Sequence, residues 1–130
     1  MAATVARVAL IVLALAGAAW LAVAHHSFGA QDRIATLALK PEPTKADLAE
    51  ARDLLPRARR LNPDVRVQQG IGVLEFRTGD AAAATATFRR LAAREPRNAE
   101  LWALLARVAR DEDPALAARA ARRATALSPR

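Results

Sequence analysis

The chain has 130 residues, enough for one small domain, and carries a formal net charge of +7 from 20 basic and 13 acidic residues. It has no cysteine, which excludes a disulfide framework, a thiolate metal site and a cysteine nucleophile. Alanine contributes 35 residues, whereas aromatic residues make up only 4%. Because alanine, leucine and arginine favour helices and β-branched and aromatic residues are scarce, the composition predicts an all-α fold.

An uncharged segment extends from Val8 to Gln31, and its apolar part ends at Ala24. As a helix, the apolar part is about 25 Å long, and extension through Phe28 brings it to about the 30 Å of a hydrocarbon core. Residues 1–27 are therefore predicted to form a transmembrane signal-anchor helix. The alternative is a signal peptide cleaved near Ala24, where Ala22-Val23-Ala24 has the small-x-small pattern of a cleavage site, which would give a secreted protein.

The charges that flank this segment bear on its orientation. Arg7 favours a cytoplasmic N-terminus, whereas Arg33, Lys40 and Lys45 favour the opposite orientation. A short tail before the apolar run is typical of a signal-anchor. We therefore expect a single-pass protein of the cell membrane with an extracytoplasmic C-terminal domain.

Residues 28–43 are predicted to be a juxtamembrane linker, because Pro41 and Pro43 prevent a continuous helix. Thr44 and Asp47 then resemble a capping box at the start of a helix. The domain boundary is placed there, which makes residues 44–130 the folded domain.

This domain contains a repeat with a period of 33 residues. Three prolines keep that spacing, and so do four other sets of positions: Pro63, Pro96 and Pro129; Asp47, Asp80 and Asp113; Ala51, Ala84 and Ala117; Leu55, Phe88 and Ala121; Ala58, Leu91 and Ala124. The period predicts two full helical hairpins after a leading half unit. Residues 44–62 would be the second helix of that half unit, and Pro56 is expected to kink it.

Polar residues and glycines mark the ends of the predicted helices. Four residues suit helix N-caps, namely Asp64, Asp80, Asn98 and Asp113, the last followed by Pro114 at the first helical position. Gly79 suits the left-handed conformation that ends a helix. Gly70 and Gly72 fall inside a predicted helix, where we expect them to allow close approach of a neighbouring helix; the alternative is a loop.

The repeat resembles the tetratricopeptide repeat (TPR) family. The family signature is represented by Ala84, Phe88, Pro96, Trp102, Leu105, Ala117 and Pro129. The period is one residue short of the family's 34, Gln69 replaces the tryptophan in the first full unit, and Ala121 replaces the second-helix aromatic in the last. The resemblance implies a short α-solenoid of about two and a half helical hairpins, and a membrane-anchored adaptor for protein–protein interaction or assembly.

The resemblance also implies a partner-binding groove along the first helices of the units. Its inner positions would be Leu74, Arg77, Ala103, Arg107 and Arg110. Since arginine pairs bidentately with carboxylates, we expect a partner with an acidic or C-terminal carboxylate segment; the alternative is a solvated basic surface. The alanine-rich core is expected to be marginally stable alone, which favours contact with another protein or a second copy.

The sequence predicts no enzymatic activity, no cofactor and no metal site. The only serines are Ser27 and Ser128, and the only histidines, His25 and His26, are adjacent and precede the domain. Alternatives to the adaptor are a small accessory subunit of a larger membrane complex, and a basic surface that binds nucleic acid or anionic lipid. Nucleic acid is the less favoured ligand, because no aromatic stacking platform accompanies the arginines.

Overall fold

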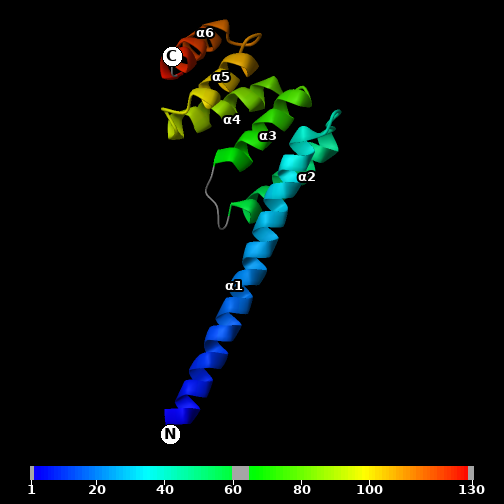
Figure 1. Ribbon diagram of the computed structural model, residues 1–130. Coiled ribbons are helices and arrows are strands. Elements are labelled where there is room, and N and C mark those ends of the chain that lie inside the picture. Colours follow the sequence, from blue (N-terminus) through cyan, green and yellow to red (C-terminus); the bar gives the residue numbers. More distant parts are fainter. Residues whose placement is uncertain (1, 60–64, 129–130) are drawn as a thin grey trace.

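The computed structural model of the chain describes residues 2–59 and 65–128, and all regular secondary structure in these ranges is α-helical (Figure 1). The prediction of an all-α fold is confirmed. In chain order the helices of these ranges are α1 (Ala2–Leu39), α2 (Lys45–Ala58), α3 (Val65–Arg77), α4 (Ala81–Arg94), α5 (Ala99–Val108) and α6 (Pro114–Leu127).

The helices pack as three successive pairs. α1 packs against α2, α3 against α4, and α5 against α6. The pairs are joined because α3 also contacts both helices of the first pair, and α5 contacts α4. Figure 1 shows the pairs stacked on one another, with the N-terminal part of α1 extending well beyond the stack.

Helix α1 continues further than the sequence predicts. Residues 28–39, which fall in the predicted linker, are helical, and the helix stops just before Pro41. Its last three turns carry apolar side chains at helical spacing, and Ala30, Ile34 and Leu37 are buried. Because this end of α1 packs on α2, the leading unit has a first helix of its own, and the prediction of a half unit is wrong.

The local signals for helix ends are confirmed within the described residues. Thr44 caps α2 in a capping box with Asp47, and Asp80, Asn98 and Asp113 each cap the helix that follows. Gly79 ends α3 with a φ of 88°, in the left-handed region that favours glycine. The predicted cap Asp64, and two of the three repeated prolines, Pro63 and Pro129, lie outside the described residues.

Pro56 lies inside α2, and the helix continues through it to Ala58. Proline has no N–H to donate to the carbonyl one turn earlier, which is that of Arg52. The backbone hydrogen-bond ladder of α2 therefore lacks the bond from residue 56. The helix ends two residues later, at Ala58.

The core consists of two clusters that share α3. The first joins α1, α2 and α3, and its buried members are Ala30, Ile34, Leu37, Leu48, Ala51, Ala58, Val67, Ile71 and Leu74. The second joins α3 to α6, and its buried members are Val65, Ala84, Phe88, Leu91, Ala92, Leu101, Leu105, Val108 and Ala120. Phe88 and Trp102 belong to the same cluster, with Phe88 fully buried and Trp102 partly so.

The two glycines of α3 lie where neighbouring helices approach it from opposite sides. A methyl group added at Gly70 would lie 3.2 Å from Cγ2 of Ile34 on α1. One added at Gly72 would lie 2.8 Å from Cε2 of Phe88 on α4, closer than real contacts allow. The expected role of these glycines in close helix approach is confirmed. They let α3 pack tightly against both α1 and α4.

Candidate partner-binding site

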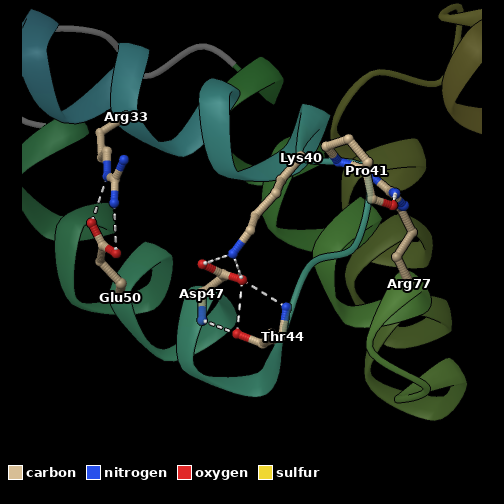
Figure 2. A network of polar contacts seen from close by, with 7 residues as sticks. All are labelled: Arg33, Lys40, Pro41, Thr44, Asp47, Glu50 and Arg77. Atoms are coloured by element: carbon tan, nitrogen blue, oxygen red, sulfur yellow. Dashed lines mark hydrogen bonds and ion pairs between the residues drawn. The ribbon is translucent and has the colours of Figure 1, made fainter.

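Two of the five predicted groove residues have structural roles inside the chain. Leu74 has no exposed surface and belongs to the first core cluster, so it cannot contact a partner in this structure. Arg77 donates hydrogen bonds to the backbone carbonyls of Ala38, at 2.9 Å, and of Pro41. These carbonyls belong to the end of α1 and the turn after it, where helical partners are missing. Arg77 therefore ties α3 to the α1–α2 turn (Figure 2).

The other three predicted groove residues lie together at the opposite end of the stack. Ala103, Arg107 and Arg110 line an open depression of about 390 Å³ between α5 and α6. Four alanines complete its lining: Ala106, Ala117, Ala118 and Ala121. We refer to these seven residues as the α5/α6 groove. Its floor is made of small side chains, and its charged groups are two arginines.

The repeat register shows what this groove corresponds to in the earlier units. Ala51, Ala84 and Ala117 are equivalent positions; the first two are fully buried, whereas Ala117 is partly exposed. Likewise Phe88 is fully buried, and its equivalent, Ala121, is exposed. In the first unit this surface is covered because α3 packs on both α1 and α2. On α6 the groove therefore exposes two positions, Ala117 and Ala121, whose equivalents on α4 are buried.

The two arginines of the groove differ in their surroundings. The guanidinium carbon of Arg107 lies 5.9 Å from the centre of the Phe76 ring, within cation–π range. This contact holds Arg107 against α3 while its side chain stays exposed. Arg110, one turn later, is exposed near the end of α5. The groove therefore presents two positive charges beside an apolar floor.

The acidic run after α5 includes the cap of α6. Oδ1 of Asp113 accepts a hydrogen bond from the N–H of Leu116 at 2.8 Å, as expected for an N-cap. Asp111 and Glu112 are exposed in the turn before it.

A second polar surface, between α1 and α2, is compensated within the chain (Figure 2). Arg33 donates to Glu50 at 2.6 Å, and Nζ of Lys40 lies 2.9 Å from Asp47. The hydrogen bond from Lys40, followed by those from the backbone and hydroxyl of Thr44, lowers the pKa of Asp47 to about 2. The hydrogen bond from Arg33 likewise lowers the pKa of Glu50. Since each charge here has a partner, this surface is less suited to bind a charged ligand than the α5/α6 groove.

A buried carboxylate joins three helices, and sequence reasoning missed it. Glu75 on α3 is only 5% exposed. Its carboxylate accepts hydrogen bonds from Arg52 on α2 at 2.8 Å and from Thr87 on α4 at 2.7 Å. Both carboxylate oxygens thereby have hydrogen-bond partners, so Glu75 cross-links α2, α3 and α4. Because its partners are 23 and 12 residues away, no local sequence pattern predicts the burial of Glu75.

Four of the seven repeat-signature residues serve the packing of the stack. Ala84, Phe88 and Leu105 are fully buried in the second cluster. Trp102 packs at its edge and donates its indole N–H to the carbonyl of Pro96 at 3.1 Å, which fixes the α4–α5 turn.

No protein-family model, curated protein or solved structure matches the chain.

Proposed function

We propose that this chain is a membrane-anchored helical-repeat adaptor that binds an acidic segment of another protein in the α5/α6 groove. The observation that carries the proposal is the exposure on α6 of Ala117, in part, and of Ala121, whose equivalents on α4, Ala84 and Phe88, are fully buried. An alanine-lined surface exposed to water is apolar, and covering it with a helix lowers the free energy. The resemblance to TPR proteins supports a binding role in place of catalysis.

The two arginines indicate the chemistry of the partner. A guanidinium forms bidentate, charge-assisted hydrogen bonds with carboxylates, and Arg110 follows Arg107 by three residues, just after α5 ends at Val108. A helical or extended segment with aspartate or glutamate beside small apolar residues would fit this surface. A second copy of the chain is less suitable, because two α5/α6 grooves face to face would bring four arginines together.

The anchor in this proposal is the N-terminal part of α1. Within the described residues, 10–39 is the one helical stretch long and apolar enough to span a bilayer by length and composition. Large apolar side chains are exposed along it, among them Leu10, Leu13, Leu15 and Leu21, each more than 60% exposed. Exposure of this kind on every side of a helix suits contact with lipid. A small accessory subunit of a larger membrane complex is the second candidate, since its partner would cover the same groove.

We place the repeat domain on the extracytoplasmic side, and one crosslinking experiment tests orientation and groove together. The chain lacks cysteine, so Ala121→Cys creates a single reactive site in the groove. A membrane-impermeant bifunctional reagent applied to intact cells is expected to crosslink Ala121→Cys to another protein. The matched control, Ala126→Cys, lies on another exposed face of α6 and should not crosslink.

The same experiment separates the parts of the proposal. Adding Arg107→Gln and Arg110→Gln to Ala121→Cys should reduce the crosslink about tenfold or more, whereas Arg119→Gln with Arg122→Gln should leave it unchanged. Crosslinking only after lysis would overturn the orientation alone. Equal crosslinking at Ala121→Cys and Ala126→Cys would overturn the groove as the binding site. A shortened mature chain beginning near Ala24 would show cleavage and exclude the anchor.

A further inference from the structure

The C-terminal end of α2 lies level with the end of the apolar segment of α1. Phe28 is the last large apolar residue exposed on that segment, and three residues later Gln31 donates a hydrogen bond to the carbonyl of Ala58 at 3.0 Å. Three helical residues correspond to about 4.5 Å along the axis. Figure 1 shows that this end of α2 is the part of α2 nearest the extended N-terminal part of α1.

This level coincides with a bilayer surface when α1 spans the membrane. Residues 8–28 form about 30 Å of helix, the thickness of a hydrocarbon core, and place Phe28 at its edge. Gln31 then falls in the head-group region, and the hydrogen bond to Ala58 brings the end of α2 to the same depth.

The end of α2 is basic. Arg57 and Arg59 are exposed on either side of Ala58, and Arg60 follows in the sequence. Two exposed acidic residues bear on this end of α2: Asp53, one turn earlier on α2, and Asp32, which follows Gln31 on α1. Neither forms an ion pair with these two arginines among the salt bridges of the described residues, which join Arg33 to Glu50, Lys40 to Asp47 and Arg52 to Glu75.

We propose that Arg57 and Arg59 bind the head groups of anionic phospholipids around α1. The inference rests on the proposed membrane anchor and adds a lipid ligand to it. Basic side chains beside an anionic surface favour binding by about fivefold each, an effect that salt weakens. The contact would fix the tilt and height of the repeat domain above the bilayer, and so the position of the α5/α6 groove. It requires acidic lipid in whichever leaflet faces the domain.

The test uses the full chain in phosphatidylcholine vesicles. Ala35→Cys, exposed on α1 one turn beyond Gln31, carries a fluorophore as the single labelled site. Two vesicle preparations contain the same small fraction of nitroxide-bearing lipid, either phosphatidylglycerol or phosphatidylcholine, with the nitroxide near the head group. We expect several-fold stronger quenching by the phosphatidylglycerol probe at low salt, and a smaller difference at high salt.

Charge-matched variants identify the residues responsible. Arg57→Gln with Arg59→Gln should bring the quenching ratio of the two probes close to one, whereas Arg119→Gln with Arg122→Gln on α6 should keep it. Equal quenching by both probes in the unaltered chain overturns the inference while leaving the anchor intact, and it is the result expected if an acidic protein is the ligand instead. An equal fall of the quenching ratio in both double variants also overturns the inference, because it would show an effect of total charge. Absence of quenching by either probe, with no flotation of the chain with vesicles, overturns the anchor and the inference together.

Discussion

Leu15→Arg is expected to prevent stable membrane insertion of the chain. Leu15 lies near the middle of the apolar segment and is 66% exposed, so the charge would face lipid without a partner. Replacing a central leucine with arginine costs about 3 kcal/mol, a shift of about a hundredfold in the insertion equilibrium. The eight branched aliphatic residues of 8–24 together favour insertion by only about 2.5–5 kcal/mol. The measurement is the fraction of chain retained in membranes after carbonate extraction.

Leu39→Arg is the matched control for this substitution. Leu39 is on the same helix and is even more exposed, at 82%, but it lies beyond the apolar segment, next to the α1–α2 turn. We expect membrane retention of Leu39→Arg to equal that of the unaltered chain. Retention of Leu15→Arg at the same level would show that α1 does not cross the bilayer.

Gly72→Ala is expected to lower the free energy of unfolding of the repeat domain by about 1–3 kcal/mol. The added methyl group would lie 2.8 Å and 2.9 Å from two ring carbons of Phe88, which is fully buried and cannot move aside. The clash outweighs the gain of up to about 1 kcal/mol that alanine brings to a helix interior. Chemical denaturation of the full chain in mild detergent, followed by circular dichroism, measures the change.

Gly29→Ala provides the control, because an added methyl group there meets nothing within 4 Å. This variant should be as stable as the unaltered chain or slightly more stable. Combining Gly72→Ala with Phe88→Leu should recover part of the loss, since the smaller side chain relieves the contact. If Gly72→Ala alone were as stable as Gly29→Ala, α3 and α4 would not approach each other as closely as the structure shows.

Features encoded by neighbouring residues could be predicted from the sequence. The caps at Thr44, Asp80, Asn98 and Asp113 depend on hydrogen bonds to the residue three positions later, so the pattern is visible locally. Gly79 marked the end of α3 for the same reason.

Features that depend on distant residues were missed or placed wrongly. The continuation of α1 to Leu39 is stabilised by contacts with α2 and α3. The buried residues there, Ala30, Ile34 and Leu37, are interrupted in the sequence by the charged Asp32 and Arg33, so their helical spacing was not recognised. Arg77 was assigned to a binding groove, but its partners at Ala38 and Pro41 are more than 35 residues away. Leu74 was assigned to the same groove, although α3 turns it toward the first cluster.

The candidate site was predictable in part. Ala103, Arg107 and Arg110, which were predicted to line one groove, all line the α5/α6 groove. Ala118 and Ala121 were not proposed, although a shift of 33 residues relates them to Thr85 and Phe88 and places them on the equivalent surface. Because the chain contains 35 alanines, an alanine at a given position does not distinguish a groove residue from any other helical residue.

We propose that α1 is both the membrane span and the first helix of the repeat stack, without a flexible joint. Spin labels at Leu21→Cys and Ala35→Cys, one on each side of the predicted boundary at residue 28, test it in lipid vesicles by pulsed electron paramagnetic resonance. A continuous helix predicts one narrow distance distribution, with a backbone separation of about 21 Å. A broad distribution, like that of a control chain with a glycine-serine insertion after Gly29, would contradict the claim.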